Sequence, residues 1–178
     1  MQPIFDATDK NTTVYVDIDY LNFQNTSKNF SAEHSRMRPQ GTSSLGYPRK
    51  NLRLYTSAEY GCTMTDANGD VLPDGMYSFK DKAQPVNCWT LKADYAESSG
   101  SHNTGAARLW NDLMYMAQIN GEFALRTNAQ KTALQNDYEY DVRTAIDGFP
   151  IVVFHRVNAE SELVCLGQYN FNNDKSTE

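Results

Sequence analysis

The sequence lacks a hydrophobic run long enough to cross a membrane. Its longest apolar stretches, such as residues 149–154, reach about six residues, whereas a spanning helix needs about 20. Residues 1–6 also lack the basic flank and the apolar stretch of a secretory signal. Neither a membrane span nor a signal peptide is therefore expected.

Cysteine is scarce as well. The chain has three, Cys62, Cys88 and Cys165, and none of them forms a CxxC pair. An odd number without that spacing argues against a disulfide framework and against a zinc site. Cys88 and Cys165 stand within apolar runs, so we expect both to be buried as small hydrophobic side chains. A fold without disulfides is typical of a reducing compartment.

The chain also lacks an excess of positive charge. It has 16 Lys and Arg residues against 22 Asp and Glu residues, which gives a net charge of −6. This balance argues against a general nucleic-acid binder, although it is compatible with one local basic pocket. With 40% hydrophobic and 21% charged residues, the 178-residue chain is expected to fold around a sizeable core. Its eleven tyrosines, among many Asn, Ser and Thr, are typical of virion and cell-surface proteins and suit protein contacts.

Alternation of apolar and polar residues predicts a mainly antiparallel sheet. Residues 13–20 alternate most clearly, with Val14, Val16 and Ile18 on one side. Turn-forming residues at 66–70 and 73–75 separate short extended segments. The expected strands are residues 13–20, 32–38, 51–55, 86–95, 149–157 and 161–171, the last two forming a hairpin.

The period changes to that of a helix between residues 103 and 118. Its apolar face is formed by Ala106, Leu109, Trp110, Leu113 and Ala117. We expect this one principal amphipathic helix to pack on the sheet in an α+β fold, with Trp89 and Trp110 as core anchors. Residues 119–147 are expected to be mostly loop, with a short helix near 129–135.

Three segments share an order and a spacing that point to a family. Residues 41–54 read GTSSLGYPRKNLRL, residues 89–103 read WTLKADYAESSGSHN, and residues 167–172 read GQYNFN. These segments resemble GxSSxx(Y/F)PKKx(Y/F)x(L/I), WxLxA(N/D)YxDxSxxRN and GxYxLxE, three signatures of the spore-coat protein H (CotH) kinase-like family. The resemblance covers roughly residues 35–175, in the variant found in large bacteriophage virion proteins.

The resemblance implies the N-terminal, phosphate-facing lobe of a kinase-like domain. Residues 1–178 would form a single domain or the N-terminal lobe of a larger CotH-like domain. The sequence departs from the family at His102, which replaces an arginine, at Glu97, one residue later than the family's aspartate, and at Asn172, which replaces a glutamate. The family's metal-binding aspartates lie downstream of the third signature, where this chain ends. A lobe without those aspartates would bind a nucleotide weakly, or it would keep the fold of the family without binding a nucleotide.

Phosphoryl transfer needs cations and backbone N–H groups on the phosphates, and carboxylates that hold Mg²⁺. The expected cofactors are accordingly ATP and Mg²⁺, and no residue is assigned as catalytic or as a metal ligand. Lys50 and Lys92 would face a common hollow beside a cradle of loop N–H groups. The expected phosphate-binding residues are Lys50, Arg53, Lys92, Gly41, Ser43 and Ser44, and Arg49 is a further candidate cation. The alternative for the charged side chains is that they are solvated and balance nearby carboxylates.

Several further polar residues have two interpretations. Asp94 is expected to orient the turn that follows it, with a metal or catalytic role as the alternative. His102 is expected to cap or pack at a helix start rather than act as a base. Asn170, Asn172, Asn173 and Asp174 are either oxygen ligands or polar groups at the end of a hairpin.

Two functions from different classes follow. The first is a CotH-like, kinase-related fragment that binds ATP phosphates for protein phosphorylation. The second is a non-catalytic structural or adhesive virion module that reuses the fold. Both imply a phage or bacterial surface assembly, at the virion or the cell surface, with other protein chains as partners in an oligomer or a larger complex.

Overall fold

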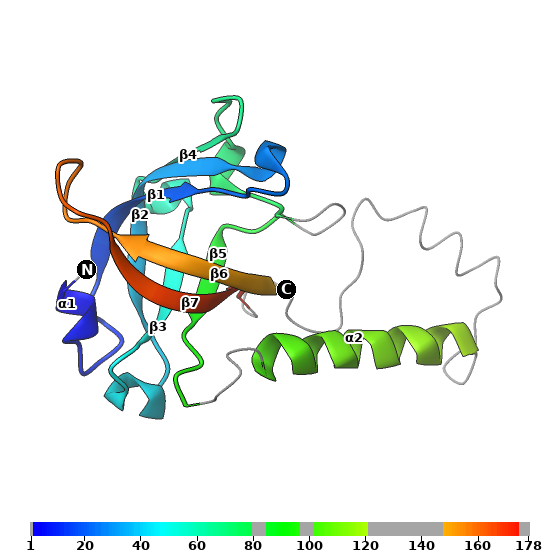
Figure 1. Cartoon of the computed structure of the whole chain (residues 1–178). Coiled ribbons are helices and arrows are strands. Elements are labelled where there is room, and N and C mark those ends of the chain that lie inside the picture. Colours follow the sequence, from blue (N-terminus) through cyan, green and yellow to red (C-terminus); the bar gives the residue numbers. More distant parts are fainter. Residues whose placement is uncertain (1, 80–84, 97–101, 121–147, 175–178) are drawn as a thin grey trace.

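The computed structural model describes residues 2–79, 85–96, 102–120 and 148–174, and its centre is one antiparallel sheet. The strand order is β1-β2-β3-β5-β7-β6, with β4 paired to β2 (Figure 1). The strands are β1 (Val14–Tyr20), β2 (Phe30–Gln40), β3 (Asn51–Tyr55), β4 (Thr63–Asp66), β5 (Cys88–Lys92), β6 (Gly148–His155) and β7 (Val164–Asn173). All ladders between them are antiparallel, which confirms the predicted sheet type.

The predicted strands are all present, with shifted ends. Exposure alternates along β1, so the half-buried strand expected at residues 13–20 is confirmed. β2 is longer than the predicted 32–38, and β5 is shorter than the predicted 86–95. β6 and β7 pair along most of their length, as expected for a hairpin.

The sheet curls around an aromatic core. Trp89 is completely buried and stacks on Phe171 with ring centroids 4.8 Å apart, which confirms Trp89 as a core anchor. Tyr20 on β1 lies 6.2 Å from Phe149 on β6, although these strands stand at opposite ends of the strand order. The two ends of the sheet therefore bend toward each other, and the sheet forms a half-barrel with its apolar face inside.

Strand alternation gives the sheet an inner and an outer face. On β3, Leu52 and Leu54 are buried in the core, so Arg53 between them belongs to the outer face. Arg53 pairs in register with Thr90 on β5, and Thr90 pairs with Asn172 on β7. The outer face is thus the polar side of the sheet in its central strands.

The long helix forms where it was predicted but does not bury its apolar face. α2 (His102–Asn120) extends beside the sheet in Figure 1, and α1 (Gln2–Phe5) is a single turn. Leu109, Trp110 and Leu113 are 60%, 51% and 55% exposed. The expectation that they pack on the sheet, with Trp110 as a core anchor, is therefore wrong. The physical reason is that the curled sheet covers its own apolar face with aromatic side chains.

Neither helix in the described ranges has the length and apolarity to cross a membrane. The short helix predicted near residues 129–135 lies outside the described residues.

The three cysteines differ in exposure. Cys62 and Cys88 are buried, and Cys165 is exposed, so the expected burial is confirmed for Cys88 and wrong for Cys165. Cys165 lies near the start of β7, in the part of the hairpin that is exposed beyond the core. Burial, together with the charge of Asp174, raises the pKa of the Cys88 thiol to about 11. Burial also raises the pKa of Cys62.

We predict that the native protein reacts with a thiol reagent such as Ellman's reagent at Cys165 before the other two cysteines. The thiolate is the nucleophile, and burial both shields Cys62 and Cys88 and keeps them protonated at pH 8. Absorbance should show one fast thiol in the native protein and all three in denaturant. A Cys165→Ser variant should lose the fast phase, and a fast phase that persists in this variant would contradict the assigned burial.

Candidate functional site

A polar cleft lies where the loop before β3 meets the end of β5. Its volume is about 280 Å³. The lining residues are Ser44, Tyr47, Arg49, Asn51, Asp94, Tyr95, Ala96 and His102. The first four belong to the segment 41–54 and the last four to the segment 89–103. The two family-like segments therefore meet in space and build this cleft together.

Asn51 joins the two walls of the cleft. Its Oδ1 accepts a hydrogen bond from the backbone N–H of Ala93 at 2.8 Å, and its Nδ2 donates to Ser44 Oγ at 3.4 Å. Across the cleft mouth the rings of Tyr47 and Tyr95 lie 5.6 Å apart. Hydrogen bonds and a ring contact thus hold the loop before β3 against the end of β5.

Arg49 closes the cleft toward β7. Its Nη2 donates to the carbonyl of Gln168, and its guanidinium lies 5.0 Å from the ring centroid of Tyr169. Burial raises the pKa of Tyr169, and the charge and hydrogen bond of Arg49 offset part of that rise. Arg49 Nε is buried and has no hydrogen-bond acceptor within the described parts of the chain. Arg49 therefore brings a positive charge and a spare donor to the cleft wall.

Asp94 is the carboxylate of the cleft. It follows β5 with a positive φ of 42°, and its Oδ2 accepts a hydrogen bond from Asn170 Nδ2 at 2.5 Å. The turn that Asp94 is expected to orient, through N–H bonds from Glu97 or Ser98, lies outside the described residues. In the described structure Asp94 links the end of β5 to β7.

The two lysines predicted to share a hollow are separated. Lys50 is only 7% exposed, and its Nζ donates to the carbonyl of Leu45 in the preceding 3₁₀ turn. Alternation counted back from Leu52 places Lys50 on the inner side, whereas Lys92 shares the outer face with Arg53. Neither lysine lines the cleft. The described structure therefore does not bring Lys50 and Lys92 together in this cleft.

The three loop residues expected to bind phosphate, Gly41, Ser43 and Ser44, differ in their position relative to the cleft. Ser44 lines the cleft, and Ser43 is exposed in the 3₁₀ turn Ser43–Gly46. Gly41 has a φ of +114°, and a Cβ added to it would lie 1.9 Å from Ser44 Oγ. Glycine is thus required at position 41 to let the loop turn toward the cleft.

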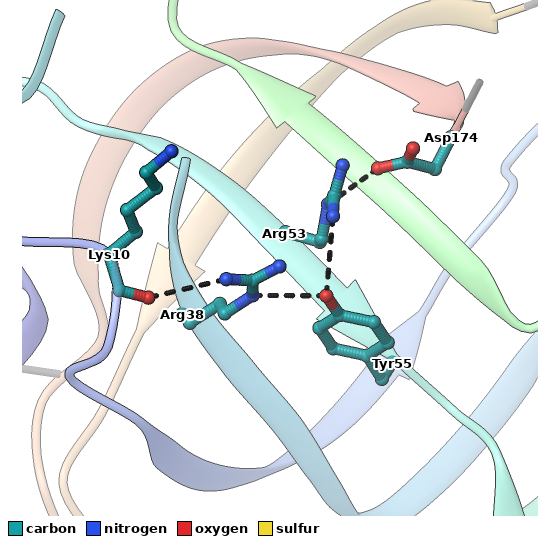
Figure 2. A network of polar contacts seen from close by, with 5 residues as sticks. All are labelled: Lys10, Arg38, Arg53, Tyr55 and Asp174. Atoms are coloured by element: carbon teal, nitrogen blue, oxygen red, sulfur yellow. Dashed lines mark hydrogen bonds and ion pairs between the residues drawn. The ribbon is translucent and has the colours of Figure 1, made fainter. Parts of the chain in front are cut away.

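Arg53, the third predicted cation, is engaged on the outer face. Its Nε lies 2.6 Å from Asp174 Oδ2, and Asp174 is completely buried (Figure 2). Its Nη1 donates to the hydroxyl of Tyr55 at 3.5 Å. Burial by itself lowers the pKa of Arg53, but the bond to Tyr55 and the charge of Asp174 outweigh it, so the pKa is raised. Arg53 therefore acts in the described structure as a structural cation.

Three polar residues at the end of β7 and directly after it are buried rather than exposed at a hairpin end. Asn170, Asn172 and Asp174 are each at most 1% exposed. Asn170 binds Asp94 and Asp174 pairs with Arg53, so β7 connects the cleft to the outer-face network. Among the described residues no group of three His, Cys, Asp or Glu side chains could hold a metal ion.

Sequence reasoning missed the role of Asn51 and an arginine cluster on the outer face. Arg36 and Arg38 stand two residues apart on β2 and therefore share a face. Arg38 pairs in register with Arg53, a like-charge pair that costs about 0.2–1 kcal/mol in a sheet unless it is compensated. The spacing Arg-x-Arg in an extended segment was the available signal.

Comparison with protein-family models, curated proteins and solved structures finds no match to this chain. The fold and the cleft define a β-rich domain with an open polar cleft at one end of its sheet. The likeness to the CotH family rests on the three segments described above.

We predict that Asp174→Asn lowers the free energy of unfolding by about 1–3 kcal/mol, because it leaves the Arg53 guanidinium without its buried counter-ion. This range is below the usual cost of breaking a buried pair, since Arg53 is 19% exposed. Urea unfolding would measure the change. The matched control is Asp112→Asn on the exposed surface of α2, which should have little effect. Equal stability of the two variants would rule out the structural role assigned to the pair.

Proposed function

We propose that this chain is a CotH-like module that serves a structural or adhesive role in a phage or bacterial surface assembly, without transferring phosphate itself. The observation that carries this proposal is the engagement of the expected phosphate-binding cations. Lys50 binds the carbonyl of Leu45 and Arg53 pairs with Asp174, so these two side chains support the fold. Lys92 lies on the outer face and does not line the cleft.

The fit of ATP and Mg²⁺ to the described residues supports the same reading. Among the described residues the cleft lining contains one carboxylate, Asp94, and its Oδ2 accepts a bond from Asn170. Mg²⁺ bound to phosphates is held by one or two carboxylates, with waters completing its shell. Asp94 is thus the single carboxylate that the described lining offers to such an ion, and we derive no reaction step through a metal–nucleotide complex.

A surface role is favoured by the apolar side chains of the β6–β7 hairpin. Five of them are more than half exposed: Val152, Phe154, Val157, Leu163 and Val164. Exposed apolar residues gathered on one hairpin are typical of protein contacts in an assembly. The partners in this proposal are other protein chains.

A second candidate function, binding of nucleotide phosphate in the cleft, is favoured by one observation. The buried Nε of Arg49 has no acceptor in the described part of the protein, and Arg49 lines the cleft together with Ser44 and His102. A phosphate oxygen would satisfy such a donor. In this alternative Arg49 replaces Lys50 and Lys92 as the cation.

Lys50→Gln tests the structural role that our proposal gives to Lys50. We predict that this variant loses about 1–3 kcal/mol of stability without any ligand, because a charge-assisted hydrogen bond inside the loop is removed. The melting temperature should fall by several degrees, since 1 kcal/mol corresponds to roughly 2–4 °C in a chain of this size. Lys10→Gln, at an exposed lysine, is the matched control.

The same thermal scans, repeated with Mg·ATP at about 5 mM, test the nucleotide alternative, since a ligand that binds the native state raises its melting temperature. We expect no rise in the wild-type protein. A rise that Arg49→Gln abolishes would establish the second candidate. A rise that Lys50→Gln abolishes, with no loss of stability in the free protein, would overturn the structural role of Lys50.

A further inference from the structure

Three arginines surround Tyr55 on the outer face of β2 and β3. The Arg36 guanidinium carbon lies 5.3 Å from the ring centroid of Tyr55 and 4.6 Å from that of Tyr60. The Arg38 guanidinium carbon lies 5.6 Å from the Tyr55 centroid. The Tyr55 hydroxyl accepts from Arg38 Nε at 3.0 Å and from Arg53 Nη1 at 3.5 Å (Figure 2). Tyr55 is therefore the centre at which the three cations meet.

The charges of this cluster are not balanced within the described structure. Asp174 neutralises Arg53. The acceptors of Arg38 are neutral, namely the Tyr55 hydroxyl and the Lys10 carbonyl at 3.4 Å. Arg36 contacts the two tyrosine rings but makes no hydrogen bond or ion pair with the described residues. Two positive charges thus remain uncompensated on the surface of a chain whose net charge is −6.

The aromatic rings hold these guanidinium groups and leave their donors available. A guanidinium that lies against an aromatic ring is fixed in position by the cation–π attraction. Its N–H groups point outward in its own plane, where they match the oxygens of a phosphate, sulfate or carboxylate. With respect to the described residues, Arg36 keeps all five of its N–H donors in this way, and Arg38 keeps those of Nη2.

We propose that Arg36 and Arg38 form a binding site for a tetrahedral oxyanion, a sulfate or phosphate group that is either free or esterified to a sugar. Residues two apart on one strand face are separated by roughly 6.5–7 Å, so both guanidinium groups can reach one tetrahedral anion between them. Tyr60 lies beside Arg36 and offers a flat ring to a sugar that carries the anion. This site is separate from the cleft, whose lining includes neither arginine.

A single charged group fits this face better than a long polyanion. The acidic remainder of the protein repels an extended negative chain such as a nucleic acid, whereas one oxyanion meets only the local field of the cluster. A sugar ester would also suit an adhesive module, and in this respect the inference deepens the proposed function. Binding of the free anion does not require that function.

The test is a titration with inorganic sulfate, glucose 6-sulfate and glucose, followed by the NMR signals of the arginine Nε–H groups at constant ionic strength. We expect saturable binding of both anions, with shifts at Arg36 and Arg38, and none with glucose. Tighter binding of glucose 6-sulfate than of sulfate would identify a sugar ester as the ligand, and equal binding would identify the free anion. The absence of saturable binding by either anion would overturn the proposal.

Substitutions of the two arginines test whether sulfate binds at Arg36 and Arg38. Arg36→Gln should weaken sulfate binding roughly tenfold or more, the loss expected for a hydrogen bond to a charged group. Arg36→Gln combined with Arg38→Gln should abolish it. Arg36→Lys keeps the charge but loses the planar fork, so it should bind with intermediate affinity. Thermal melting of each variant would show that it is folded.

Two controls separate this site from general attraction and from the cleft. Arg156→Gln removes one exposed positive charge elsewhere and should leave the affinity unchanged. Arg49→Gln removes the cation of the cleft and should also leave it unchanged. Weakening by Arg156→Gln equal to that by Arg36→Gln, or weakening by Arg49→Gln alone, would contradict the proposed location.

Discussion

The pairing of β3 with β5 is the constraint on which the rest of the structure depends. Four residue pairs, from Leu52 with Leu91 to Tyr55 with Cys88, join two segments that lie more than thirty residues apart in the sequence. This pairing buries Leu52, Leu54 and Trp89 on the inner face. It also brings the loop before β3 against the end of β5, where Asn51 bonds both walls and the cleft forms. The buried core and the cleft thus both follow from the register in which β3 pairs with β5.

The outer face shows how the protein accommodates polar residues in the middle of its sheet. Asp174 is completely buried, and an isolated buried carboxylate would be strongly unfavourable. Arg53 compensates it at 2.6 Å, and Tyr55 links Arg53 to Arg38. The ion pair secures the C-terminal end of the described sheet, while the arginines of β2 extend the positive charge toward the surface. One network therefore serves both stability and, in our proposal, anion recognition.

The resemblance of three segments to a kinase family concerns the fold. The internal contacts of the lysine and arginine side chains concern catalysis. The segments 41–54 and 89–103, on which the resemblance rests, meet in space and line the cleft. Catalysis depends on where individual charged atoms point, and here Lys50 turns into its own loop. A fold can keep its shape after its charged groups have taken structural partners. This separation is why we favour a module of an assembly over a phosphate-transferring enzyme.

The sequence by itself determined the strands, their antiparallel hairpin and the position of the long helix, because apolar periodicity reports local geometry directly. It also indicated that segments 41–54 and 89–103 belong together. Only the tertiary structure decided which way the charged side chains face. Lys50 bonds within its own loop, whereas Lys92 lies on the outer face, because successive side chains of a strand point to opposite faces and the register between β3 and β5 sets those faces. Trp110 and Cys165 are exposed for a related reason. An apolar residue is buried only where another apolar surface is available to pack against it, and the inner face of the curled sheet is already covered by the sheet's own side chains.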